Sequence, residues 1–140
     1  MTVAMKQIYF AAAIVVASCG LPMSSAVARS ELDRDLDGYA IASCMIASHS
    51  PVLIEQGHGW AGAIVQRSHG PIKIFQQIAS AVNQEIRVSG FALGHRDGPV
   101  QSSRLNLFMV TCGEIVDNRR VAIAIARARV SLVRYYNKSR

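Results

Sequence analysis

The sequence predicts an all-α protein, a compact bundle of about five helices that one disulfide bond ties together. Apolar residues recur at helical spacing through most of the chain, as they do on helices that bury one face. Glycine and proline residues divide these stretches into segments of helical length. Strand-like alternation is scarce, because the alternating residues 121–125 are followed by alanine and arginine, which favour helices.

The first expected helix covers residues 33–48. Its apolar stripe consists of Leu36, Tyr39, Ala40, Cys44 and Ala47. Three aspartates, Asp33, Asp35 and Asp37, suit the positive end of the helix dipole and predict a solvated helix start. The same run also resembles the beginning of a calcium-binding loop, but the glutamate that such a loop needs at its twelfth position is missing.

The second expected helix covers residues 51–68. It begins at Pro51 because the residue before a proline avoids the helical region. Gly57, Gly59 and Gly62 interrupt it, and each glycine costs about 1 kcal/mol relative to alanine. We therefore expect these small residues to let a neighbouring helix approach closely.

The third expected helix, residues 71–88, has the clearest amphipathic pattern of the chain. We expect Gly70 to be the C-cap of the helix before it and Pro71 to lie in its own first turn. Residues 89–103 contain three glycines and a proline and predict a loop. This loop is longer than most helix-to-helix connections, and loops of that size are often functional.

The last two expected helices cover residues 104–117 and 121–136. Ser102 or Ser103 would cap the first of them, and residues 118–120 would form the hinge between the two. The final helix is rich in arginine.

The first 28 residues predict a cleavable export signal. Lys6 precedes an apolar run, and small residues up to Ala28 form the exit that signal peptidase requires. In a second interpretation, which stays open, Cys19 ends a lipobox and is lipidated. The apolar run is shorter than the roughly 20 residues that span a bilayer, which argues against a membrane anchor. We expect a signal peptide at 1–28 and a single helical domain at 29–140, located in the periplasm.

Removal of the signal peptide leaves Cys44 and Cys112 out of three cysteines. In an oxidising compartment two thiols normally form a disulfide bond. The alternative is a catalytic thiol assisted by a histidine, but both cysteines lie in apolar helical patterns, which favours the disulfide.

The formal net charge is +6, and basic residues crowd the C-terminal end. Such an end can bind nucleic acid, anionic lipid or an acidic protein, and export argues against nucleic acid. No phosphate-binding loop, zinc-ligand spacing or nucleophile motif is present in the sequence. We therefore expect no enzymatic activity, no cofactor and no metal, and a binding role becomes the default.

Three segments that follow the export signal resemble the immunity proteins of type VI secretion amidase effectors. They read YAIASCMIA at residues 39–47, PIKIF at residues 71–75 and LNLFMVTC at residues 105–112. The resemblance implies a periplasmic, all-helical and often dimeric inhibitor. Such proteins neutralise a peptidoglycan-cleaving amidase by inserting a protruding loop into its active-site cleft.

In this chain the matching loop is the segment from Gly94 to Ser103. The resemblance makes the following residues candidates for contact with the amidase: Gly94, His95, Arg96, Asp97, Gly98, Gln101, Ser102 and Ser103. The alternative for the loop is that it is merely solvated. The alternative function is an envelope-associated protein whose basic C-terminal helix binds anionic lipid or an acidic partner. In the inhibitor interpretation the membrane is involved only if Cys19 is lipidated.

Overall fold

A computed structural model describes residues 30–95 and 104–137 and confirms the all-α fold class. Its helices are α1 (Glu31–Ile46), α2 (Pro51–Ser68), α3 (Ile72–Ser89), α4 (Phe108–Glu114) and α5 (Arg119–Tyr136), with a 3₁₀ turn, η1 (Ile115–Asp117), after α4. Two short strands, β1 (Leu93–His95) and β2 (Arg104–Asn106), pair between α3 and α4. The expected signal peptide lies outside the described residues. None of the helices described combines the length and hydropathy that a membrane crossing needs.

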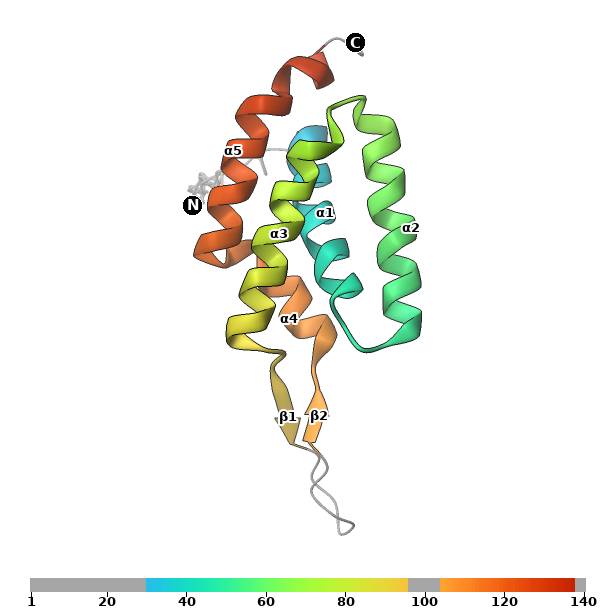
Figure 1. Cartoon of the computed structure of the whole chain (residues 1–140), viewed down its shortest axis with the longest axis vertical. Coiled ribbons are helices and arrows are strands. Elements are labelled where there is room, and N and C mark those ends of the chain that lie inside the picture. Colours follow the sequence, from blue (N-terminus) through green and yellow to red (C-terminus); the bar gives the residue numbers. More distant parts are fainter. Residues whose placement is uncertain (1–29, 96–103, 138–140) are drawn as a thin grey trace, which may run out of the picture.

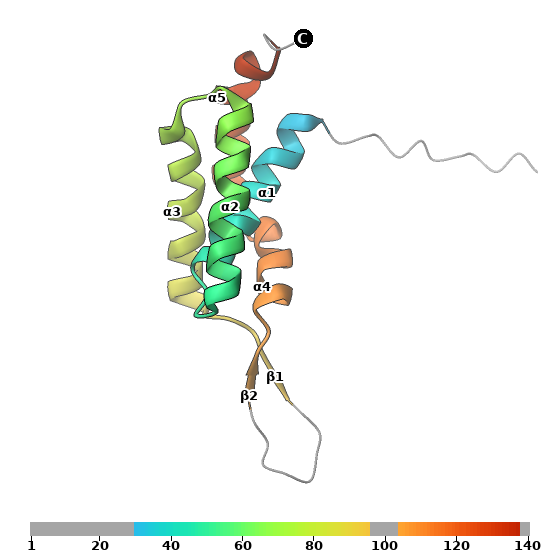
Figure 2. The same cartoon turned by 90° about the vertical axis from the view of Figure 1, so that its right-hand side faces the viewer.

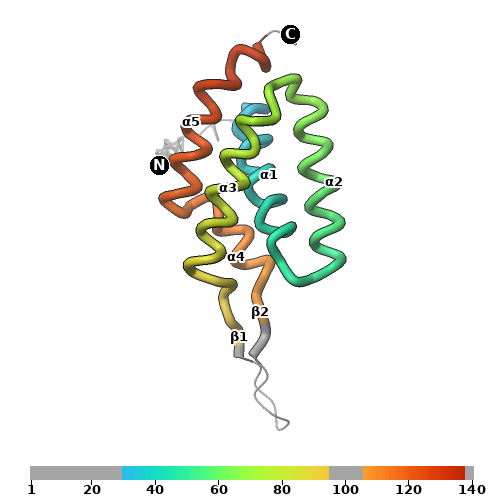
Figure 3. Tube along the Cα trace, in the orientation of Figure 1, coloured from blue at the N-terminus to red at the C-terminus, as the bar shows by residue number. Residues whose placement is uncertain are grey.

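Helices α1, α2 and α3 run alternately down and up in Figure 1, α4 and α5 both run upward, and α1 occupies the centre of the bundle. It packs against α2 on one side and against α3 and α5 on the other. The two strands project beyond the helices, at the opposite end of the molecule from the C-terminal end of α5 (Figures 1 and 2). The Cα trace in Figure 3 shows that α4 leads back from this projection into the bundle.

The core surrounds α1, which is buried on most of its circumference because other helices cover it on several sides. Its largest fully buried apolar side chains are Leu36, Ile64, Phe75, Ile78, Val82, Val121 and Leu132. The rings of Tyr39 and Phe75 meet at 5.0 Å between centroids and join α1 to α3.

The predicted disulfide bond between Cys44 and Cys112 is confirmed. It joins α1 to α4, and the two Cα atoms are 5.4 Å apart. Neither cysteine is therefore a free thiol, which removes the basis for a catalytic cysteine at these positions.

The prediction of a close helix contact at the glycines of α2 is correct for one of the three. A Cβ atom on Gly57 would lie only 2.7 Å from the carbonyl oxygen of Ala42 in α1. Gly59 and Gly62 have no neighbouring atom within 4 Å of such a position. Of the three glycines of α2, only Gly57 therefore lies where a side chain would push α1 and α2 apart.

The predicted C-cap at Gly70 is wrong, because His69 takes the left-handed conformation there, with φ of 49°. Gly70 serves a different purpose. A Cβ atom at this position would meet the Leu132 side chain of α5 at 2.4 Å. Gly70 thus makes room for α5 and does not supply a special backbone angle.

The predicted helix at residues 104–117 is wrong in its first part. Residues 104–106 form β2, and α4 begins only at Phe108, with Leu107 at its N-cap and no side-chain cap. Ser102 and Ser103, the expected caps, lie outside the described residues. The reason for the difference is that β2 pairs with β1, a partner that local helical spacing cannot reveal.

The start of α1 also differs from the prediction. The helix begins at Glu31, because the Ser30 side chain accepts a hydrogen bond from the Asp33 backbone N–H and caps it. The aspartate run is helical and forms no calcium loop. Asp35 is only 2 % exposed, so the expected solvated start is wrong for this residue.

Candidate functional site

The two strands form an antiparallel ribbon that begins and ends at defined residues. Leu93 lies opposite Asn106, and Gly94 lies opposite Leu105. On the bundle side of the Leu93–Asn106 pair, the backbone N–H of Leu107 donates to the carbonyl oxygen of Ala92 at 2.8 Å. We call this ribbon, residues 93–95 and 104–106, the projecting hairpin.

Side chains anchor the projecting hairpin to α4. The backbone N–H of Ala92 donates to the Thr111 hydroxyl oxygen at 2.9 Å. The rings of Phe91 and Phe108 pack edge to face with 4.7 Å between their centroids. Such aromatic pairs stabilise a contact beyond the area that they bury.

Gly94 completes the anchor because it leaves room for Leu107. A Cβ atom at Gly94 would lie 3.1 Å from the Leu107 side chain, which is a tight contact. One turn further along α4, Cys112 forms the disulfide to α1. The base of the hairpin is therefore bonded, through α4, to the central helix of the bundle.

Several apolar side chains close in sequence to the base of the hairpin are exposed. Leu93 is 58 % exposed in β1, and Met109 and Val110 are 62 % and 48 % exposed in α4.

The structure places only two of the predicted contact residues, Gly94 and His95, and both lie in β1. The other six, Arg96, Asp97, Gly98, Gln101, Ser102 and Ser103, lie outside the described residues. Neither strand was predicted from the sequence. The Asp97-Gly98 dipeptide, a common turn signal between paired strands, could have indicated them.

A polar cluster centred on the buried carboxylate of Asp35 joins three helices. The Asp35 carboxylate of α1 accepts hydrogen bonds from Arg67 Nε of α2 at 3.0 and 3.1 Å, and a further one from an Arg67 terminal nitrogen. It also accepts a hydrogen bond from the Tyr136 hydroxyl of α5 at 2.6 Å. The cluster therefore ties the end of α5 to α1 and α2.

The electrostatics of this cluster suit a structural role. Burial, and then the hydrogen bond to Asp35, raise the pKa of Tyr136 above its ordinary value. The hydrogen bond to Asp35 raises the pKa of Arg67. Tyr136 thus stays a neutral donor and Arg67 a cation, and both satisfy the buried carboxylate.

The basic helix α5 is partly neutralised by its neighbours. Arg129 pairs with Asp33 of α1, and Arg120 lies 3.6 Å from Glu85 of α3. The Arg134 guanidinium stacks over the Tyr135 ring, 4.9 Å from its centroid. Among the described residues no group of three or more histidine, cysteine, aspartate or glutamate side chains is arranged to hold a metal ion.

No family model matches this chain, and no curated protein or solved structure matches it.

Proposed function

We propose that this protein is an exported inhibitor that binds a peptidoglycan amidase and blocks its active-site cleft. The contact would be made by the projecting hairpin and the residues that connect its strands, 96–103. The observation that carries the proposal is the projection of β1 and β2 beyond the helices (Figure 1).

The rigidity of the hairpin base supports this role. An element that enters a cleft loses less conformational entropy on binding when it is already held in place. Four contacts hold this base: a backbone hydrogen bond from Leu107 to Ala92, the bond from the Ala92 N–H to the Thr111 hydroxyl, the Phe91–Phe108 pair and the nearby disulfide. Steric blocking of a cleft requires no catalytic residue of the inhibitor itself.

The disulfide supports the expected compartment. Disulfide bonds persist in oxidising environments such as the periplasm and are rare in the cytosol. The bond between Cys44 and Cys112 thus agrees with export through the predicted signal peptide. The resemblance of residues 39–47, 71–75 and 105–112 to amidase immunity proteins is the further support.

Co-expression with a periplasm-directed amidase tests the proposal. The native protein should prevent lysis of the host cells, whereas the triple variant H95A, R96A, D97A should protect much less. Substitution R87A is the matched control, because Arg87 is an exposed cation on α3 outside the hairpin. The proposal is wrong if native protein leaves wall degradation unchanged, or if the control loses as much protection as the triple variant.

A further inference from the structure

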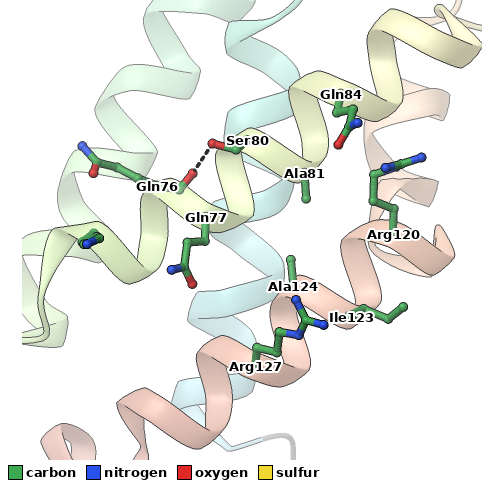
Figure 4. Close-up of a pocket in the computed structure, with 10 residues that line it drawn as sticks. Gln76, Gln77, Ser80, Ala81, Gln84, Arg120, Ile123, Ala124 and Arg127 are labelled. Atoms are coloured by element: carbon green, nitrogen blue, oxygen red, sulfur yellow. Dashed lines mark hydrogen bonds between the residues drawn. The ribbon is translucent and has the colours of Figure 1, made fainter.

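A groove of about 620 Å³ runs between α3 and α5, on the outer side of the contact between these helices. It exists because Ala81 and Ala124, which face one another there, are too short to fill the space (Figure 4). Toward the core, the two helices pack against each other, and Ile78 of α3 and Ile125 of α5 are buried there. The groove thus has a floor of small apolar residues between two helices that cannot easily close on it.

The rim of the groove is positively charged. Lys73 of α3 and Arg120 and Arg127 of α5 line it, and no acidic residue does. Arg120 is partly neutralised by Glu85, 3.6 Å away, and keeps nearly half of its side chain exposed. No described residue forms an ion pair with Lys73 or Arg127. Within the described part of the chain, the groove therefore presents two cations without an ion pair and one that is partly neutralised.

Amide side chains complete the lining and point to the conformation of the occupant. Gln77 and Gln84 lie along the α3 side (Figure 4). A glutamine amide both donates and accepts hydrogen bonds, and it can pair with free backbone groups. An extended segment offers such groups, whereas a helix has used its own internally.

The dimensions of the groove set the length of the occupant. From Lys73 to Gln84 the α3 wall is about 16 Å long at 1.5 Å per helical residue. An extended chain in the polyproline II conformation covers this length with about five residues, at roughly 3.1 Å per residue. Arg120 and Arg127 are about 10 Å apart along α5, which corresponds to acidic residues about three positions apart in that chain. Residues three positions apart lie on the same side of such a chain, because it has three residues per turn.

We infer that this groove binds an extended acidic segment of a partner protein, about five residues long, with carboxylates at its first and fourth positions. Charge complementarity favours this occupant, because the cations line a hollow and not a raised face that could lie flat on lipid headgroups. The inference rests on α3 and α5 alone. It does not depend on the amidase contact of the projecting hairpin.

A peptide titration tests the inference on the disulfide-bonded protein. The probe is a labelled pentapeptide with glutamate at positions 1 and 4, and its partner is the same peptide with glutamine there. Fluorescence anisotropy should show binding of the glutamate peptide only, and the affinity should fall as salt rises. The double variant R120E, R127E should weaken binding about tenfold or more, since each reversed charge faces one of the two glutamates of the peptide.

The control variant is R87E, which changes the charge of the same helix outside the groove. It should bind the glutamate peptide nearly as well as the native protein does. Equal binding of both peptides, equal loss in R87E, or unchanged affinity in the double variant would overturn the inference. Two further outcomes would also overturn the inference. Binding of phosphatidylglycerol vesicles without binding of the peptide would favour lipid as the occupant. A native protein that is a dimer, together with a double variant that is a monomer, would favour a second copy. The triple variant H95A, R96A, D97A should lose protection against the amidase but still bind the peptide. The two proposals can therefore fail separately.

Discussion

Two glycines of α2 should respond in opposite directions to the same substitution. Gly57 faces α1, where a methyl group would lie 2.7 Å from the Ala42 carbonyl oxygen and 3.1 Å from the Ile46 backbone nitrogen. Gly59, two residues further along the same helix, has no atom within 4 Å of that position. Gly57→Ala and Gly59→Ala therefore form a matched pair in which only the neighbouring helix differs.

Two contributions to the change in the free energy of unfolding, helix propensity and overpacking, can be estimated separately. Replacement of a helical glycine by alanine stabilises a helix by about 1 kcal/mol, and this gain applies to both variants. Overpacking costs roughly 1–3 kcal/mol. The cost for Gly57→Ala should lie in the upper half of this range, because the added methyl group would meet backbone atoms of α1. We expect Gly59→Ala to stabilise the protein by up to about 1 kcal/mol and Gly57→Ala to destabilise it by about 1–2 kcal/mol.

Thermal unfolding followed by circular dichroism measures both effects. A change of 1 kcal/mol shifts the Tm of a domain of this size by about 4–8 °C, so the two variants should differ by at least about 8 °C. A rise in Tm for both variants, by similar amounts, would refute the assignment of Gly57 as the spacer between α1 and α2.

Three further changes test the bonds that tie the helices together. Replacing Cys44 and Cys112 by alanine should cost about 4 kcal/mol, because their disulfide spans 68 residues; an unchanged urea midpoint would contradict this. Arg67→Ala should cost about 2 kcal/mol, because it leaves the Asp35 carboxylate buried with one partner fewer; this figure is reduced because Arg67 is half exposed. Tyr136→Phe should destabilise the protein at neutral pH by about 1.5 kcal/mol through loss of the hydrogen bond to Asp35. Because the folded state raises the pKa of Tyr136, its contribution is complete below about pH 10 and is lost as the pH rises further, so the difference between native protein and Tyr136→Phe in urea unfolding should shrink above that pH. A constant difference up to pH 11 would exclude this linkage.

Local patterns predicted most of the helices. The second expected helix, residues 51–68, has the observed bounds, and the first, third and fifth differ from the observed helices by one or two residues at an end. Proline breaks and apolar spacing are properties of neighbouring residues, so they can be read without knowledge of the fold. The candidate loop was located in the same way, from its glycines and proline.

The surfaces that could act in binding were not predictable in this way. The groove needs Ala81 and Ala124 to face one another from two helices that lie far apart in the chain. In the sequence, Lys73 and Gln84 belong simply to the polar face of an amphipathic helix. Their common orientation toward α5 follows only from the packing of the bundle.

The sequence by itself determined the helical fold class and the pairing of Cys44 with Cys112, since both follow from residue spacing and from the count of cysteines outside the predicted signal peptide. The tertiary structure decided which polar and small residues matter. Asp35 is buried because α2 and α5 bring Arg67 and Tyr136 to it. Gly70 is required by a leucine of α5, and residues 104–106 form a strand because β1 lies beside them. Each of these outcomes depends on a partner distant in the chain. A local sequence pattern carries no information about such a partner, so it cannot predict the free energy of the contact.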